Sequence, residues 1–89
     1  IEVEVRNTAE IEEALAVGVD RIMLDNFTPE RTAEAVKLIR SKAPGVEIES
    51  SGGITFDTLR AYGEAGVDFI SVGALTHSVK GLDLSFKAC

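Results

Sequence analysis

The sequence has no tryptophan, only two prolines and one cysteine, and no long apolar run. A single cysteine, Cys89, cannot form an internal disulfide, so the expected compartment is a reducing cytoplasm. Cys89 also has no base beside it in the sequence, and we do not expect it to be catalytic. No stretch of about 18 apolar residues is present to span a bilayer, so no membrane partner is expected.

Basic residues are also scarce, with nine Lys and Arg against fifteen Asp and Glu and a net charge of −6. A chain without a basic face cannot neutralise a row of phosphates, so nucleic acid is not an expected partner. The remaining composition is typical of a globular protein, with 45% hydrophobic residues in a chain of 89. A domain of this size is expected to bury roughly 60% of its unfolded surface, which makes it marginally stable on its own.

Apolar periodicity divides the chain into alternating strands and helices. Asn7, Thr28 and Thr55 each have the sequence context of a helix N-cap. A short final helix is expected from Leu75 to Val79. We predict strands at residues 1–5, 21–25, 46–50 and 69–72, with longer helices over residues 8–18, 29–43 and 55–66.

The run Gly18-Val19-Asp20, followed by an apolar strand, recurs as Gly66-Val67-Asp68, again followed by a strand. Such a repeat is typical of βα units, in which a helix connects each strand to a parallel neighbour. The predicted fold class is therefore α/β, a parallel (β/α) repeat of four βα units. Four strands cannot close a barrel, so we expect part of an incomplete (β/α) barrel of TIM type. A small open sheet, or pairing with a second copy, is the alternative.

Two strands end in serine and glycine, in Glu49-Ser50-Ser51-Gly52-Gly53-Ile54 and in Ile70-Ser71-Val72-Gly73-Ala74-Leu75. Sequence that is expected to form a helix follows each of them. Glycines let a phosphate approach the backbone, and a helix N-terminus adds partial positive charge. In (β/α) barrels the phosphate site commonly lies after the last two strands. The two stretches together predict a phosphate site.

Strand alternation places acidic side chains on one face of the predicted sheet. Glu4 and Asp25 come late in their strands, where they could reach the open end of a barrel and bind a metal ion or sugar hydroxyls. Ion pairs with basic residues from elsewhere, or a solvated face of an open sheet, would explain the same pattern. We prefer the functional interpretation for these two residues. Glu2 and Glu47 come earlier in their strands and are expected to be structural.

Several other polar residues are weaker candidates. Glu49 fits a structural and a functional role equally, and Ser71 belongs to the polar face of its strand. His77 comes just after the second glycine stretch, where it could touch a phosphate, but a single histidine there more often caps or packs. Asn26 could cap the turn after Asp25 or serve the site. A metal centre built from His and Cys is not expected.

In their order and spacing these motifs resemble the C-terminal part of the quinolinate phosphoribosyltransferase family, the carboxylating nicotinate-nucleotide pyrophosphorylases. The resemblance extends over essentially the whole sequence. The motifs that carry it are Glu2-Val3-Glu4-Val5, Met23-Leu24-Asp25-Asn26, Glu49-Ser50-Ser51-Gly52-Gly53-Ile54, Gly66-Val67-Asp68, Ile70-Ser71-Val72-Gly73-Ala74-Leu75-Thr76-His77-Ser78 and Leu82-Asp83-Leu84.

The resemblance implies a sandwich-like N-terminal α/β domain before the incomplete barrel, in a homodimer or a higher homo-oligomer. Because the sequence begins inside a predicted strand, we expect residues 1–89 to be a single fragment of the barrel's C-terminal portion, without the N-terminal domain and the first strands. The implied enzyme transfers the phosphoribosyl group of 5-phosphoribosyl-1-diphosphate (PRPP) to quinolinate and releases CO₂, which yields nicotinate mononucleotide for NAD biosynthesis. It uses Mg²⁺ and no organic cofactor.

By position, the resemblance makes Glu4 and Asp25 catalytic carboxylates that contact the ribose and its metal-diphosphate end. It assigns the 5′-phosphate to small residues of the two glycine stretches: Ser51, Gly52, Gly53, Gly73 and Ala74. The family's Arg and Lys cluster for the quinolinate carboxylates lies upstream of this sequence. Arg6, Arg21 and Lys80 are scattered along the chain, so we expect the fragment alone to be inactive.

Two other functions stay open at this point. Isomerase and cyclase barrels of histidine biosynthesis also end strands in Ser-Gly-Gly and in other glycine-containing loops. A non-catalytic half barrel that binds sugar phosphates is the second alternative. The pair of Glu4 and Asp25 and the run Leu75-Thr76-His77-Ser78 favour the phosphoribosyltransferase.

Overall fold

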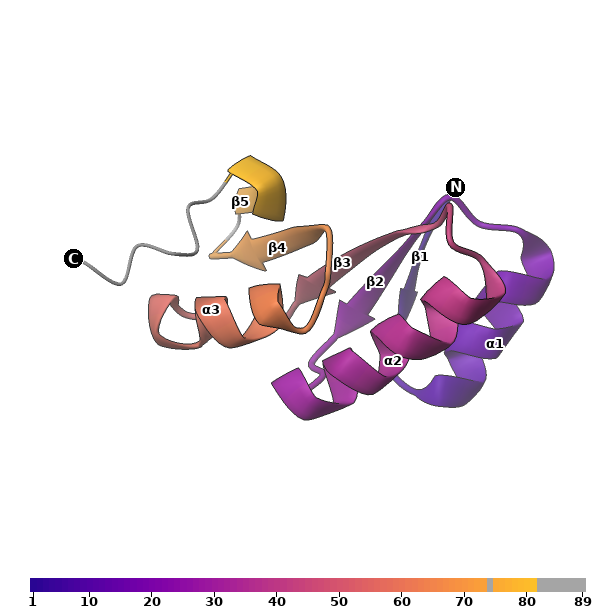
Figure 1. Ribbon diagram of the computed structural model, residues 1–89, viewed down its shortest axis with the longest axis horizontal. Helices are drawn as coiled ribbons and strands as arrows, with labels where there is room; N and C mark the ends of the chain where they lie inside the picture. The colour runs from indigo at the N-terminus through magenta and orange to yellow at the C-terminus, as the bar shows by residue number, and fades with distance from the viewer. Residues whose placement is uncertain (74, 82–89) are drawn as a thin grey trace.

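The computed structural model describes residues 1–73 and 75–81, which form one sheet with helices packed against it (Figure 1). The strands are β1 (Glu2–Val5), β2 (Arg21–Asp25), β3 (Glu47–Ser51), β4 (Phe69–Val72) and β5 (Leu75–Ser78). The helices are α1 (Thr8–Val17), α2 (Pro29–Lys42) and α3 (Phe56–Glu64), followed by a 3₁₀ turn, η1 (Val79–Gly81). The strands lie in the order β1-β2-β3-β4-β5; β1 to β4 are parallel, and β5 is antiparallel to β4. Within this part of the chain, no helix is long and apolar enough to cross a membrane.

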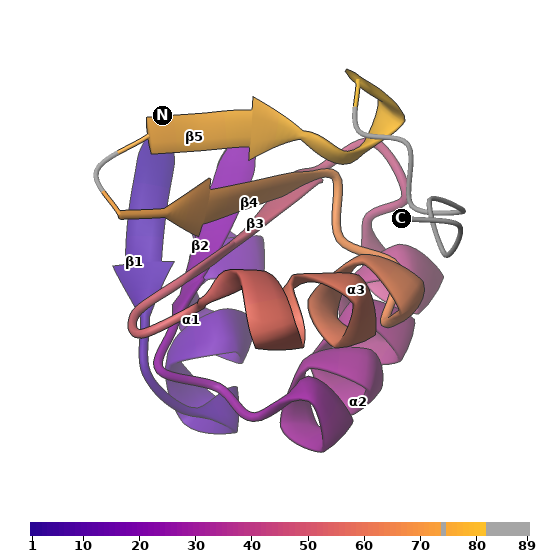
Figure 2. The same cartoon turned by 90° about the vertical axis from the view of Figure 1, so that its left-hand side faces the viewer.

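The hydrophobic core lies between the sheet and helices α1, α2 and α3, which cover the same face of the sheet (Figure 2). Ile11 of α1, Ile39 of α2 and Leu59 of α3 are buried in this core. Burial stabilises the fold by about 1.5–3 kcal/mol for each large aliphatic side chain. Strand alternation predicted the aliphatic side chains of the strands for this face, and five of them are fully buried: Val5, Ile22, Leu24, Ile48 and Ile70. Val3 and Val72 are partly buried, whereas Ile1 is exposed.

Local capping explains where the helices begin. The Asn7 Oδ1 atom accepts a hydrogen bond from the backbone N–H of Glu10 (2.9 Å), and Thr28 Oγ1 caps α2 in the same way (3.1 Å). Before α3, the Thr55 N–H donates to Thr58 Oγ1 (3.1 Å). Each contact satisfies a backbone group that a helix leaves unpaired at its N-terminus, so the three predicted helix starts are confirmed.

The prediction of a final helix from Leu75 to Val79 is wrong. Leu75–Ser78 is strand β5, which forms a hairpin with β4, and η1 follows it. Five residues are too few for a stable isolated helix, whereas the edge of β4 offers backbone groups that another strand can pair with. Gly73 takes a left-handed backbone conformation (φ +64°) at the turn, which a glycine adopts without steric cost.

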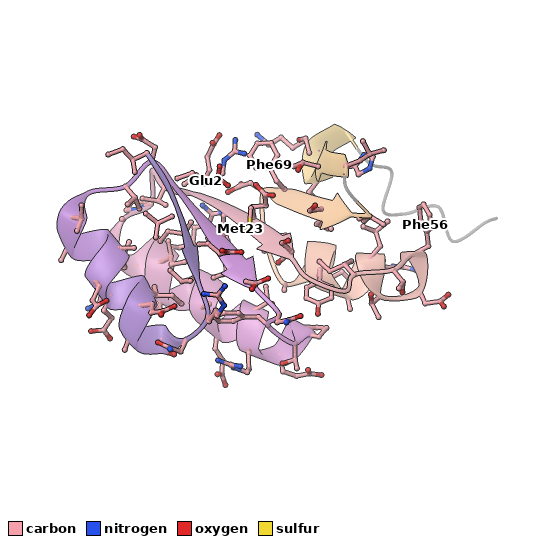
Figure 3. All side chains as sticks on the ribbon, turned by 180° about the vertical axis from the view of Figure 1, so that it is seen from behind. Glu2, Met23, Phe56 and Phe69 are labelled. Atoms are coloured by element: carbon pink, nitrogen blue, oxygen red, sulfur yellow. The ribbon has the colours of Figure 1, made fainter. Side chains whose placement is uncertain are left out.

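The face of the sheet away from the helices carries charged side chains together with a few apolar ones (Figure 3). Glu2, Met23 and Phe69 point from this face, as strand alternation predicts. Because β1 to β4 are parallel, their carboxyl ends meet along one edge of the sheet. We call this the strand-end edge; it is formed by the last residues of the four strands and the loops that follow them: Val5, Asp25, Ser51 and Val72.

Candidate functional site

Asp25 and Ser51 are neighbours at the strand-end edge, because β2 and β3 pair in register there. Asn26, which follows Asp25, donates its backbone N–H to the Ser51 carbonyl oxygen (2.9 Å). Asn26 has a left-handed backbone (φ +63°), a conformation that asparagine adopts more readily than most residues. The predicted carboxylate and the first predicted phosphate loop are therefore held side by side by backbone contacts.

The first glycine loop, Ser51 to Thr55, connects β3 to α3. Gly52 (φ +95°) and Gly53 (φ +73°) both take the left-handed conformation that favours glycine. A Cβ atom added to Gly53 would have no described atom within 4 Å, so the backbone there is open to a ligand. The loop leads directly into the N-terminus of α3, and this combination of glycine backbone and helix N-terminus is suited to binding an anion.

The second glycine loop differs from its prediction. Gly73 lies at the same edge and has open space where a Cβ would stand, as far as the described residues extend. The residues that follow it form β5, so no helix N-terminus adds positive charge at this loop. Ala74 lies outside the described residues. The structure therefore gives the first loop more of the expected features of a phosphate site than the second.

Glu4 and Asp25 share one cation, Arg6. The Arg6 Nε atom lies 3.4 Å from Asp25 Oδ2, and Arg6 Nη2 lies 3.7 Å from Glu4 Oε1. The Asp25 side chain is 20% exposed, whereas that of Glu4 is 48% exposed. The strand-end edge thus holds one partly buried and one open carboxylate, and both can present negative charge to a bound ligand.

Arg6 is a residue of this site that the sequence analysis missed, because it counted Arg6 among the scattered basic residues. The signal for it was spacing: residues two apart along an extended chain point to the same side, and Arg6 follows Glu4 by two. The sequence left open an ion pair between the carboxylates and a basic residue from elsewhere. Arg6 supplies such an ion pair from within the chain.

Glu49 lies further down β3 and is buried, in a separate cluster with Arg21 and the exposed Glu47. The Arg21 Nη1 atom lies 3.4 Å from Glu49 Oε1, and Arg21 Nη2 lies 2.9 Å from Glu47 Oε1. Burial raises the pKa of Glu49, the nearby Glu2 charge raises it further, and the Arg21 guanidinium opposes both effects. These ion pairs connect β2 to β3, which agrees with a structural role for Glu47.

His77 does not join the strand-end edge, whereas Ser71 reaches it: Ser50 pairs with Ile70, so the next residue of β4, Ser71, lies level with Ser51. Both belong to the β4–β5 hairpin, where Ser71 is opposite Thr76 and His77 is opposite Ile70. Residues that are directly opposite each other in an antiparallel pair share a face of the sheet. His77 therefore lies on the side of the buried Ile70, which faces the helices, and not beside the glycine loops. The predicted residues that the structure brings together at the strand-end edge are Glu4, Asp25, Ser51, Gly52, Gly53, Ser71 and Gly73.

Glu4 and Asp25 are the carboxylates of this site that could bind a metal ion. Among the described residues, no group of three or more His, Cys, Asp or Glu side chains could hold a metal ion by itself. Glu4 and Asp25 are on neighbouring strands and contact the same guanidinium. Mg²⁺ is commonly bound by one or two carboxylates together with the phosphates of a substrate. The pair therefore fits a magnesium ion that arrives with a diphosphate.

Comparison with known proteins reveals similarity along the whole chain. Residues 1–87 match the family described as quinolinate phosphoribosyl transferase, C-terminal domain. The probable nicotinate-nucleotide pyrophosphorylase (carboxylating) of Methanocaldococcus jannaschii is 52% identical over 89 residues, which is 96% of this chain and 31% of that protein. The nicotinate-nucleotide pyrophosphorylase (carboxylating) of Rattus norvegicus is 39% identical over 87 residues, which is 98% of this chain and 29% of that protein.

A solved structure shares the fold as well as the sequence. The structure of the nicotinate-nucleotide pyrophosphorylase from Francisella tularensis has a TM-score of 0.73 and 46% identity to this chain. The match covers 83% of this chain and 25% of the other. The chain therefore spans about a third or less of the proteins that it matches. The sequence-based family resemblance and the predicted fold class are confirmed.

Proposed function

The chain belongs to the quinolinate phosphoribosyl transferase family, where it corresponds to the C-terminal domain, and we propose that it supplies the phosphoribosyl-binding part of a carboxylating nicotinate-nucleotide pyrophosphorylase. The enzyme would transfer the phosphoribosyl group of PRPP to quinolinate and form nicotinate mononucleotide, diphosphate and CO₂. The observation that carries this proposal is the direct contact between Asp25 and the Ser51-Gly52 loop at the strand-end edge.

This contact places a negative charge beside a loop suited to a phosphate. In the proposed reaction the bond from ribose C1 to the diphosphate oxygen breaks, and its electron pair leaves with the diphosphate. Positive charge develops on the ribose ring, so a carboxylate near the ring stabilises the transition state more than the ground state. Binding of the 5′-phosphate at the first glycine loop anchors the sugar at a point away from the reacting bond, which holds C1 beside Asp25.

The quinolinate ring nitrogen forms the new bond to C1. The carboxylate at ring position 2 then leaves as CO₂, and the ring carbon keeps the bonding electrons and takes up a proton. Glu4 and Asp25 would act on the ribose and on the departing diphosphate, with Mg²⁺ neutralising diphosphate charge when it is bound. Arg6, which contacts both carboxylates, would compensate their charge before the substrate arrives.

The rest of the active site is proposed to come from other parts of a longer polypeptide. Quinolinate has two carboxylates, and residues 1–89 offer no basic cluster for them within the described part of the strand-end edge. We propose a homodimer or a higher homo-oligomer of the full-length enzyme, in the cytoplasm, with no organic cofactor. The isomerase and cyclase barrels of histidine biosynthesis are not favoured, since the relatives reported above carry the pyrophosphorylase name.

The test is turnover by the full-length polypeptide that contains this chain, supplied with PRPP, Mg²⁺ and quinolinate carrying a labelled carbon in its position-2 carboxylate. We expect labelled CO₂ and nicotinate mononucleotide in equal amounts.

Asp25→Asn, which removes the charge with little change in shape, should lower kcat/KM about 100-fold. Glu12→Gln, on the exposed surface of α1, is the matched control and should leave turnover unchanged. Full activity of Asp25→Asn would contradict the role of Asp25, and no product from the native enzyme would contradict the proposed reaction.

A further inference from the structure

We infer that Gly52 is a positioning residue for Asp25, in addition to any contact that its backbone makes with a phosphate. It lets the first glycine loop pack directly against the turn formed by Asp25 and Asn26. The inference rests on the proposed function for the consequence in catalysis, but the packing itself depends only on the geometry of this chain.

The distances from a Cβ atom placed on Gly52 to its neighbours show how tightly the loop packs against the turn. A Cβ atom on Gly52 would stand 2.8 Å from Asn26 Oδ1, 2.9 Å from the Asn26 backbone nitrogen and 3.0 Å from Asp25 Oδ1. Distances below 3.0 Å are not tolerated between such atoms, so some of these groups would have to move. The loop and the carboxylate therefore form one packed unit.

The backbone around Gly52 explains why the turn cannot simply move aside. Asp25 is paired in register with Ser51, and the Asn26 N–H is hydrogen-bonded to the Ser51 carbonyl oxygen (2.9 Å). Asn26 is also held in a left-handed conformation (φ +63°), which restricts how its backbone can adjust. The side chains of Asn26 and Asp25 can move more easily than the paired backbone, so we expect a Cβ on Gly52 to displace both, the Asp25 carboxylate included.

Gly53 provides a control within the same loop. It also has a left-handed backbone (φ +73°), but a Cβ there would meet no described atom within 4 Å. Gly52→Ala and Gly53→Ala both place an L-residue at positive φ, with more strain at φ +95° than at φ +73°, and both narrow the approach of a phosphate. Only the Gly52 substitution puts an atom against Asp25, so comparing the two variants with and without the Asp25 charge isolates the effect of this contact.

The test measures kcat and the KM for PRPP of the full-length enzyme with Gly52→Ala or Gly53→Ala, each in the native background and together with Asp25→Asn. We expect both substitutions to raise KM and Gly52→Ala alone to lower kcat at least tenfold. With Asn at position 25, Gly52→Ala should lower kcat less than twofold further, because the charge that it displaces is already absent. Equal kcat values for the two glycine variants, or the same tenfold loss with and without Asp25, would overturn the inference.

Crystal structures of the two variants separate this inference from the proposed function. Gly52→Ala should move the Asp25 carboxylate from its native position, while Gly53→Ala should leave it in place, whatever reaction the enzyme catalyses.

If Gly52→Ala does not fold, Asn26→Ala tests the packing between the turn and the loop by changing the turn instead, because alanine fits φ +63° poorly. Asn26→Ala should lower kcat and leave the KM for PRPP unchanged, and Asn26→Gly, which fits this φ, should keep native kcat. Native kcat in Asn26→Ala would count against the inference.

Discussion

At the residue scale, the arrangement of charge around Asp25 decides what the strand-end edge can bind. Two carboxylates face one guanidinium, so the pair keeps a net negative charge that a divalent cation can use. Arg6 competes with such a cation for Asp25, and its own side chain is mostly exposed. An ion pair of this kind is worth roughly 0.2–1 kcal/mol, which makes it easy to displace.

The role of Arg6 can be measured by removing its charge. We expect Arg6→Gln to tighten the binding of Mn²⁺ in the presence of inorganic diphosphate by roughly twofold to fivefold, the range that corresponds to an exposed ion pair. Arg60, which pairs with Glu64 on the surface of α3, gives the matched control Arg60→Gln with no expected change. Equal or weaker Mn²⁺ binding in Arg6→Gln, relative to the native enzyme, would show that Arg6 does not compete with the cation.

The buried carboxyl group of Glu49 should make the free energy of unfolding fall as the pH rises. Its pKa is raised in the folded chain above the ordinary value of 4.5, chiefly by burial. The folded state therefore binds this proton more tightly than the unfolded state, and the free energy of unfolding falls as the pH rises from about 4.5 through the raised pKa. Below 4.5 the carboxyl group is protonated in both states, and the penalty disappears.

Urea unfolding of the native enzyme and Glu49→Gln at a series of pH values tests this sign. The glutamine cannot ionise, so its stability relative to the native chain should increase with pH above about 4.5. Glu47→Gln, which removes an exposed carboxylate in contact with the same Arg21, is the matched control for the loss of that contact. Parallel curves for the native enzyme and Glu49→Gln would contradict the account of this cluster.

At the element scale, Asp68 joins three segments at the amino ends of the strands. Its Oδ2 atom accepts a hydrogen bond from the Ile48 N–H (2.9 Å) and lies 3.0 Å from Arg40 Nη2. Arg40 also donates to the carbonyl oxygen of Val46 (3.1 Å). The second copy of the repeated Gly-Val-Asp run thus fixes α2 and β3 relative to the start of β4.

Asp68→Ala should lower the free energy of unfolding by about 1–2 kcal/mol, because it leaves the Ile48 N–H without its acceptor and Arg40 without its carboxylate. Glu12→Ala, on the exposed side of α1, is the control for loss of a surface carboxylate. Urea unfolding gives both values. Equal stability of the two variants would mean that Asp68 does not hold these elements together.

The elements that the sequence predicted well are those that depend on local contacts. The starts of α1, α2 and α3 follow from a side chain and a backbone N–H three residues apart, so Asn7, Thr28 and Thr55 could be identified without a structure. Strand faces followed from alternation in the same way. The end of the described chain could not be predicted, because residues 75–78 take their conformation from pairing with β4 and not from their own sequence.

The site shows the same division between local and non-local information. Asp25 and the Ser51-Gly52 loop were identified from strand ends and glycines, and the parallel sheet brings them together. The contact of Gly52 with Asn26 depends on the register between two strands, which the sequence does not specify. Arg6 was missed because its partner Asp25 lies on another strand.

At the scale of the whole molecule, the β1 edge of the sheet carries apolar surface. A groove of about 290 Å³ runs between β1 and α1, and its lining is mainly apolar: Val3, Val5, Ala14, Val17 and Val19, with Glu4, Glu10 and Glu13. β1 lies at the end of the sheet order. Apolar surface beside an end strand fits the proposal that the chain is part of a larger barrel in which further strands continue from β1.

The most direct test of the central claim is a crystal structure of the full-length enzyme with ribose 5-phosphate bound. We expect electron density for the phosphate at the backbone of Ser51, Gly52 and Gly53, with the ribose hydroxyls within hydrogen-bond distance of Asp25 or Glu4. Density for the phosphate at the opposite, amino-terminal ends of the strands, or at a site that residues 1–89 do not form, would contradict the claim that this chain holds the phosphoribosyl group.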